Sequence, residues 1–368
     1  MTVATSARLL PTYARLGVTF VEGDGAWLVD ANGKRYLDLV AGIAVVALGH
    51  RHPAPMAAAH AQLDRLWHVS NLYSTEPMEA LAGRLSDRFG GARAFFCNSG
   101  TEAVEAALKW ARKATGRKEL VALEGSFHGR TMGALSVTGQ PAKRAPFEPL
   151  VPHVRFVTPE TLADAVTDET AAILLEPVQG EGGVRPLEAD TLTLARALAD
   201  DHGALLVFDE VQTGVGRCGA FFAWERFGVR PDAVTLAKGL ANGLPIGVLL
   251  VSDDAPTGLE PGDHASTFGG NPVSCAAACA VVDAVDAGLL AHVREISNRF
   301  ARLGAVRGLG LLLALELGRP AGPVVEAALE RGLLVGTAGE TALRLTPPLT
   351  ITAAETDAAI DLLREVIA

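Results

Sequence analysis

The fold is decided by the stretch ALLVFDEVQTG at residues 204–214, together with AVTLAKG at residues 233–239. Each stretch begins with a short apolar run of the kind that forms a buried strand. The first run ends on the carboxylate of Asp209, and the second leads to the amine of Lys238. Ligands bind beyond the carboxyl ends of parallel strands, so we expect Asp209 and Lys238 to meet at one ligand-binding edge of a sheet.

Short apolar runs alternate with helical patterns from residue 92 onward. Helices are expected at 101–114, 159–166 and 187–201. Strands are expected at 94–97, 120–123, 154–157, 171–175, 205–208, 233–236 and 247–251. This alternation predicts an α/β fold, in which a mainly parallel seven-stranded sheet carries helices on both faces.

Toward the C-terminus the pattern changes to that of a smaller α+β unit. The elements expected there are helices at 272–287, 289–303, 323–331 and 353–366, with strands at 310–317 and near Leu333 and Leu343. We predict an N-terminal arm at 1–45 that packs with the small domain, a large α/β domain at 46–270 and a small domain at 271–368. Within the arm, residues 28–39 form a predicted hairpin, because the pair Asn32-Gly33 tolerates positive φ angles.

Composition limits the classes of function. Hydrophobic residues make up 49% of the 368 residues, and the net charge is -10 with no Lys/Arg run, which argues against nucleic acid or an anionic membrane as partner. No apolar run approaches the roughly 18 residues of a membrane span. Residues 1–15 lack the pattern of a signal peptide, so we expect a cytoplasmic protein. The four cysteines form no CxxC pair, and neither a zinc site nor a disulfide framework is expected.

An Asp and a Lys at one sheet edge indicate the cofactor pyridoxal phosphate. That cofactor needs a lysine to form a Schiff base and an acidic group to hold its pyridinium nitrogen. Taken singly, Asp209 has an ordinary explanation as a strand cap and Lys238 as a solvated loop residue. They are 29 residues apart (238 minus 209), which leaves room for a crossover to the next strand.

The segment NSGTEA at residues 98–103 lies where a predicted strand turns into a helix. Free N–H groups and the positive helix end favour a phosphate at Ser99, Gly100 and Thr101. An ordinary N-cap explains the same residues equally well.

Three further loops carry polar or aromatic groups between glycines. Phe127 is suited to stack on a flat ring, and Arg130 to bind a substrate carboxylate. Glu181, flanked by glycines, is suited to pair with an arginine. Ser266 and Thr267 offer two hydroxyls in a loop that enters a helix.

Taken together, these segments resemble the class III aminotransferases, the ornithine-type subgroup of the fold-type I pyridoxal-phosphate enzymes. The similarity covers nearly the whole chain. The motifs that carry it are LPTY (10–13), AGIAV (41–45), LGHRHP (48–53), NSGTE (98–102), DEVQTG (209–214), Lys238 and LRLTPP (343–348). Within the class, the stretches at 41–53, 70–73 and 126–131 are most similar to the acetylornithine subgroup.

The resemblance implies a role for each matching residue. Lys238 would hold the cofactor as a Schiff base, and Asp209 would pair with the ring nitrogen. The other implied cofactor contacts are Ser99, Gly100, Thr101, Phe127, Val211, Gln212 and, toward the cofactor of the other subunit, Thr267. The role of Thr267 implies a homodimer.

The implied substrate contacts include two arginines. Arg130 would bind the distal carboxylate of the amino donor, and Arg344 the α-carboxylate of glutamate. Glu181 would cover Arg344 while an ornithine-type substrate is bound, and Ser266 is also expected at the substrate.

The activity that the resemblance implies is transfer of the terminal amino group of N-acetylornithine to 2-oxoglutarate, as in arginine biosynthesis. The products are N-acetylglutamate semialdehyde and glutamate. Succinylornithine, ornithine, 4-aminobutyrate and a carrier-bound lysine-pathway substrate remain open as alternative donors, and so does an aminomutase of the same fold. A non-catalytic regulator is disfavoured, because both Lys238 and Asp209 are present.

Overall fold

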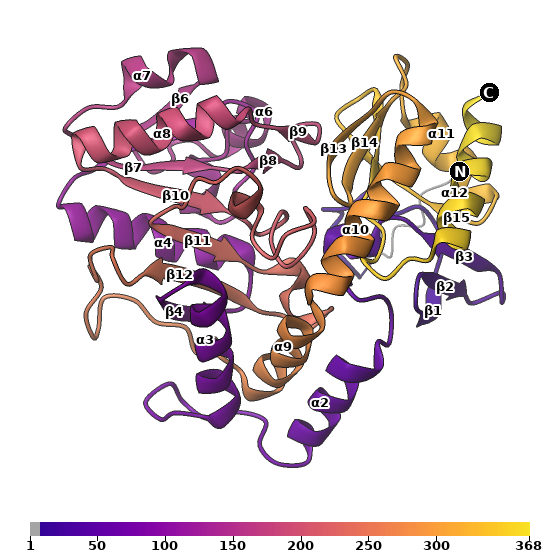
Figure 1. Ribbon diagram of the computed structural model, residues 1–368, viewed down its shortest axis with the longest axis horizontal. Coiled ribbons are helices and arrows are strands. Elements are labelled where there is room, and N and C mark those ends of the chain that lie inside the picture. Colours follow the sequence, from indigo (N-terminus) through magenta and orange to yellow (C-terminus); the bar gives the residue numbers. More distant parts are fainter. Residues whose placement is uncertain (1–7) are drawn as a thin grey trace.

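The computed structural model describes residues 8–368, and its largest element is a seven-stranded sheet (Figure 1). The strands are β4 (Ala92–Cys97), β5 (Glu119–Leu123), β6 (Val154–Val157), β7 (Thr170–Leu175), β10 (Leu205–Asp209), β11 (Ala233–Leu236) and β12 (Gly247–Ser252), in the order β4-β12-β11-β10-β7-β5-β6. Only β12 runs antiparallel to its neighbours in this sheet. The predicted seven-stranded, mainly parallel α/β sheet is therefore confirmed.

Helices α4 (Gly100–Thr115) and α8 (Ala189–His202) cover opposite faces of this sheet. Alternate side chains of a strand point to opposite faces. Accordingly, Leu205 and Val207 of β10 pack in the cluster that contains α4, while Leu206 and Phe208 pack in the cluster that contains α8. The helix expected at 159–166 is a short 3₁₀ turn followed by α7 (Leu162–Ala165).

A second group of elements follows the large sheet and appears in orange and yellow in Figure 1. Its helices are α9 (Pro272–Ala284), α10 (Ala287–Phe300), α11 (Gly322–Glu330) and α12 (Ala353–Ile367). Its sheet has the order β13-β14-β17-β16, formed by Val306–Leu309, Leu312–Glu316, Ala342–Leu345 and Gly336–Ala338. The predicted helices and the strands at β14 and β17 are confirmed, whereas β13 and β16 were not expected.

Membrane-spanning helices were sought among the described residues. No single helix between residues 8 and 368 is long and apolar enough to cross a membrane. The segments Pro272–Ala284 and Ala287–Leu303 meet the criteria of length and composition only as a pair, and they are bent by 73° at their junction.

The N-terminal strands join the C-terminal part of the chain. Strands β1 (Phe20–Asp24), β2 (Trp27–Asp30) and β3 (Arg35–Asp38) form a sheet that β15 (Leu333–Leu334) completes by pairing in parallel with β3. The hairpin predicted around Asn32-Gly33 is confirmed as β2 and β3. Trp27 Nε1 also donates a hydrogen bond of 2.7 Å to Glu355 of α12.

The predicted division into three parts, with boundaries near residues 45 and 270, stays a prediction. The first seven residues of the expected arm lie outside the described residues. Helix α9 packs against α2 (Pro53–Leu63) and α3 (Glu76–Phe89), two helices that were not expected from the sequence. The apolar spacing of Leu81, Leu85 and Phe89 in α3 is a helical signal that was available in the sequence.

A left-handed turn precedes the large sheet. Its φ angles are +48° at Ala41, +64° at Gly42, +65° at Ile43 and +62° at Ala44. Only glycine adopts such angles freely, and other residues lose about 1–2 kcal/mol each. The Asp38 carboxylate holds the turn, since it accepts 2.8 Å hydrogen bonds from the N–H groups of Val40 and Ala41. Thr346 also donates a hydrogen bond to the Val40 carbonyl.

We predict that Ala44→Gly leaves stability nearly unchanged, although Ala44 is buried. Losing a buried methyl group costs about 0.8 kcal/mol, and relief of the left-handed strain returns about 1–2 kcal/mol. The matched control is Ala107→Gly in α4, which is also buried but right-handed and should lose about 2 kcal/mol. Urea unfolding at a fixed protein concentration measures the free energy of unfolding of both variants. If Ala44→Gly lowered the free energy of unfolding as much as Ala107→Gly does, the argument that Ala44 is strained would be wrong.

Candidate active site

Asp209 and Lys238 meet at one edge of the large sheet. Asp209 ends β10, and Lys238 follows the parallel neighbour β11. Both line a cavity of about 380 Å³. The sequence-predicted residues at this cavity are Ser99, Gly100, Thr101, Phe127, Arg130, Asp209, Val211, Gln212 and Lys238. The structure therefore brings both strand ends, the N-terminus of α4 and the loop of Phe127 to one cavity.

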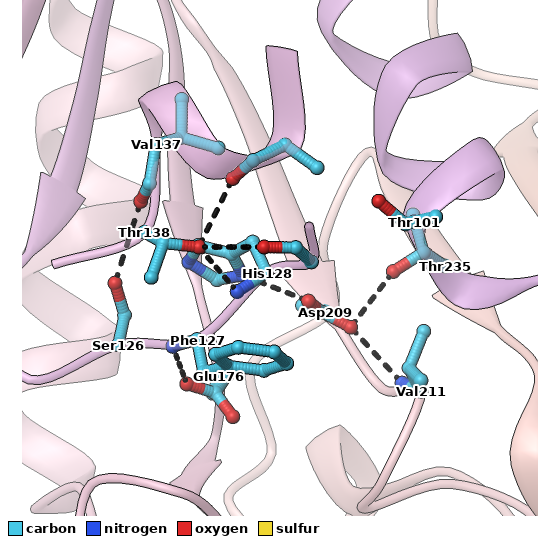
Figure 2. A network of polar contacts seen from close by, with 12 residues as sticks. Thr101, Ser126, Phe127, His128, Val137, Thr138, Glu176, Asp209, Val211 and Thr235 are labelled. Atoms are coloured by element: carbon cyan, nitrogen blue, oxygen red, sulfur yellow. Dashed lines mark hydrogen bonds and ion pairs between the residues drawn. The ribbon is translucent and has the colours of Figure 1, made fainter. Parts of the chain in front are cut away.

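The Asp209 carboxylate is buried and held by three groups (Figure 2). Its Oδ2 atom lies 2.7 Å from Nδ1 of His128, and its Oδ1 accepts hydrogen bonds from the Val211 N–H at 3.1 Å and the Thr235 hydroxyl at 3.0 Å. His128 donates to this carboxylate in the tautomer that carries the ring proton on Nδ1. These contacts fix the direction in which Asp209 faces the cavity.

His128 and Thr235 were given no role from the sequence. Thr235 is a fully buried hydroxyl in an otherwise apolar strand, and a polar residue in such a strand was the available signal. His128 lies between two loop residues that were assigned roles, Phe127 and Arg130, and its contact with Asp209 spans 81 positions. No local pattern in the sequence indicates a contact over that separation.

Lys238 is partly buried at the cavity and has a positive φ angle of 33°. Burial lowers the pKa of its amine, because the charged form loses solvation. The nearby carboxylates of Asp209 and Glu181 act against that shift without cancelling it. A lowered pKa increases the fraction of neutral amine, which is the nucleophilic form.

The N-terminus of α4 points its free N–H groups to the same cavity. Ser99 caps the helix, and Gly100 begins it. A side chain at position 100 is excluded, because its Cβ would lie 2.6 Å from Cγ1 of Val211. The Thr101 hydroxyl accepts hydrogen bonds from the N–H groups of Arg130 and Thr131, which ties the helix end to the loop of Phe127.

Phe127 and Gln212 also line the cavity that holds Asp209 and Lys238. The Phe127 N–H donates a 2.8 Å hydrogen bond to Glu176, and burial raises the pKa of Glu176 to about 7. The Oε1 atom of Gln212 is buried and has no hydrogen-bond partner among the described residues. A buried acceptor left unpaired costs about 1–3 kcal/mol, so a ligand group is expected to satisfy it.

Arg344 and Glu181 form an ion pair beside this cavity, without lining it. Arg344 belongs to β17, and Glu181 follows β8 (Val178–Gln179). Burial alone would raise the pKa of Glu181, but the charge and hydrogen bond of Arg344 outweigh burial and place that pKa below its usual value. Both residues act electrostatically on Lys238, so the pair is close to the amine.

Ser266 and Thr267 line a second cavity, of about 570 Å³, instead of the first. The Ser266 hydroxyl accepts a 3.1 Å hydrogen bond from Asn98, which lines the first cavity. The two cavities are therefore neighbours. Large apolar side chains near the second cavity are exposed, namely Trp67, Leu72, Tyr73 and Phe268.

The known proteins that are similar to this chain are aminotransferases. The family model described as aminotransferase class-III matches residues 11–367. An acetylornithine aminotransferase from Mycolicibacterium smegmatis is 50% identical over 376 residues, which cover 98% of this chain and 96% of that protein.

Two solved structures are also similar. The N-acetylornithine aminotransferase from Stenotrophomonas maltophilia has a TM-score of 0.83 and 35% identity, with 96% of each chain covered. The ornithine aminotransferase from Toxoplasma gondii has a TM-score of 0.92 and 30% identity, with 98% of this chain and 92% of that chain covered, and its active site holds partially occupied pyridoxal phosphate. This chain therefore belongs to the class-III aminotransferase family, whose members depend on pyridoxal phosphate.

Proposed function

We propose that this protein transfers the terminal amino group of N-acetylornithine to 2-oxoglutarate, with pyridoxal phosphate as cofactor. The observation that carries the proposal is the meeting of Asp209 and Lys238 at one cavity. The choice of donor is supported by relatives of 44–50% identity that are acetylornithine aminotransferases.

The residues of the cavity fit this cofactor. Lys238 offers an amine whose pKa is lowered by burial and which would hold the cofactor, and Asp209 offers a fixed carboxylate for the pyridinium nitrogen. The N-terminus of α4 at Gly100 and Thr101 suits the phosphate. The unpaired oxygen of Gln212 suits a ring hydroxyl. Ser99, Phe127 and Val211 are proposed to line the rest of the cofactor site.

Each protein group then has a defined task. Bound pyridoxal phosphate supplies an electron sink for the negative charge that forms when the substrate carbon loses its proton. Lys238 would hold the cofactor, and its amine would serve as the base that accepts the proton of the substrate carbon. Asp209 keeps the ring nitrogen protonated, and the hydrogen bonds from His128 and Thr235 keep Asp209 in place.

The ion pair between Glu181 and Arg344 supports a mechanism for accepting two kinds of donor. One half-reaction uses a terminal amine, and the other uses the α-amine of glutamate, which lies beside a carboxylate. While Glu181 covers Arg344, that guanidinium is not free to bind a carboxylate beside the reacting amine. When glutamate binds, its α-carboxylate replaces Glu181 at Arg344, and Arg130 binds the distal carboxylate in both cases.

A homodimer is also proposed. Thr267 lies at the second cavity, where it is suited to reach the cofactor phosphate of a second copy, and Ser266 links the two cavities. The exposed apolar side chains around this cavity, including Trp67 and Leu72, are a feature of association surfaces. A cytoplasmic location and the lack of nucleic-acid and membrane partners stay predictions from the sequence.

The donor assignment is tested with the purified, cofactor-loaded enzyme and 2-oxoglutarate. N-acetylornithine should give a higher kcat/KM than succinylornithine, ornithine or 4-aminobutyrate, as measured by glutamate formation. A higher kcat/KM with another donor would make that compound the preferred substrate. The protein would still be an aminotransferase. Turnover that does not need 2-oxoglutarate would favour an aminomutase.

Lys238→Ala should abolish turnover, because the amine that binds the cofactor and moves the proton is gone. Borohydride treatment of the wild-type enzyme should fix the cofactor on Lys238, as read by peptide mapping. Lys118→Ala, which removes an exposed lysine, is the control and should keep both activity and label. Label on another lysine of the loaded wild-type enzyme would refute the role of Lys238.

Glu181→Ala should shift donor preference toward glutamate by about tenfold, because Arg344 then stays uncovered in both half-reactions. The two half-reactions are measured separately, as kcat/KM for glutamate and for N-acetylornithine. Glu181→Asp keeps the charge and should keep much of the wild-type preference. If Glu181→Ala leaves the ratio of the two values unchanged, the covering role is wrong.

A further inference from the structure

Two cations lie over the same aromatic ring at the active site. The Nζ atom of Lys143 is 4.7 Å from the centroid of the Phe127 ring, and the Cζ atom of Arg130 is 5.3 Å from the same centroid. Arg130 and Phe127 both line the 380 Å³ cavity. A ring face attracts one cation by about 0.5–2 kcal/mol. A second cation at the same ring adds repulsion between like charges, so the arrangement calls for an anion.

Neither cation has a carboxylate partner in the part of the chain that the structure describes. Across residues 8–368, the side chains of Lys143 and Arg130 form no salt bridge and no hydrogen bond. Arg344, which lies beside the cavity, is by contrast paired with Glu181. The two unpaired charges are therefore free to bind an anionic ligand.

The position of Lys143 is built into the fold. Lys143 belongs to the short helix α6 (Pro141–Arg144), and its N–H donates to the Gln140 carbonyl at 3.0 Å. The side-chain amide of Gln140 donates to the carbonyls of Gly125 and Ser126, at 3.1 and 3.4 Å. These contacts tie the start of α6 to the loop that carries Phe127, so Lys143 is held beside the ring by the backbone.

The electrostatic surroundings of Lys143 are those of the substrate site. Burial lowers the pKa of Lys143, and the charges of Arg130 and Arg344 add to this shift, while Glu181 and Glu176 oppose it. Glu181 is already paired with Arg344, and the raised pKa of Glu176 leaves that carboxyl partly protonated near neutral pH. The balance of charge around Arg130 and Lys143 is thus positive, in a protein whose net charge is -10.

We propose that Lys143 and Arg130 together bind the substrate carboxylate that is distal to the reacting carbon, which makes Lys143 a specificity-determining residue. Arg130 offers a planar fork to the carboxylate, and Lys143 adds a point charge beside the same aromatic ring. The proposal rests on the aminotransferase function proposed above. It extends that function by selecting donors and acceptors that carry a carboxylate away from the reacting carbon.

The test compares two donors that differ only in this carboxylate, N-acetylornithine and N-acetylputrescine, with 2-oxoglutarate as acceptor. In Lys143→Met, kcat/KM for N-acetylornithine should fall about tenfold. In the same variant, kcat/KM for N-acetylputrescine should change less than twofold. If N-acetylputrescine is not turned over, its inhibition constant is measured instead and should change equally little. Lys143→Arg keeps the charge and should keep the discrimination.

Binding provides a readout that is independent of turnover. Titration calorimetry with glutarate, a dicarboxylate that cannot react, should show a dissociation constant about tenfold higher for Lys143→Met than for the wild-type enzyme. The matched control is Lys34→Met, which removes a lysine 4.9 Å from the centroid of the Tyr36 ring, away from the cavity. It should leave both the glutarate affinity and the discrimination between donors unchanged.

The outcomes separate this inference from the proposed function. An equal loss with both donors, or unchanged glutarate binding in Lys143→Met, would overturn the role of Lys143. Failure of the wild-type enzyme to use N-acetylornithine would overturn the proposed donor instead. The glutarate comparison would then still decide whether Lys143 helps to bind a carboxylate.

Discussion

The buried carboxylate of Asp209 is the constraint on which the rest of the site depends. A buried carboxylate is tolerated only when hydrogen-bond donors surround it, and here the donors come from three separate segments, at His128, Val211 and Thr235. Satisfying one acid therefore positions the loop after β5, the loop after β10 and strand β11 relative to each other. The walls of the cavity, including Phe127 and the α4 terminus, follow from that positioning, because the Thr101 hydroxyl joins α4 to the same loop.

Much of this architecture was predictable because most strands of the large sheet are buried on both faces. Such strands appear in the sequence as short, continuous apolar runs, and each of the seven runs from residue 94 onward became a strand of the large sheet. The same local information failed at β1, β13 and β16, which are short and only partly buried at several positions. It also gave no indication of the left-handed turn at residues 41–44. That conformation is imposed by Asp38 and Thr346, and the latter lies about three hundred positions away.

The sequence predicts those site residues that stand directly after a predicted strand. Asp209 and Lys238 could be identified because each follows an apolar run, and the cavity gathers them with most of the loop residues expected there. The sequence does not indicate which polar or charged groups become partners in the folded chain. The contacts of His128 and Thr235 with Asp209, and the shared ring of Arg130 and Lys143, depend on the packing of distant loops.

The parallel pairing of β3 with β15 has a consequence for how the chain is made. Leu37 can find its strand partner Leu333 only after almost the entire polypeptide has left the ribosome. At a synthesis rate of 5–20 residues per second, the hairpin at the beginning of the chain waits roughly 15–60 s with an unpaired edge. A strand edge left open for that time is a site at which nascent chains associate wrongly. The open edge of this hairpin is thus present before the active site exists.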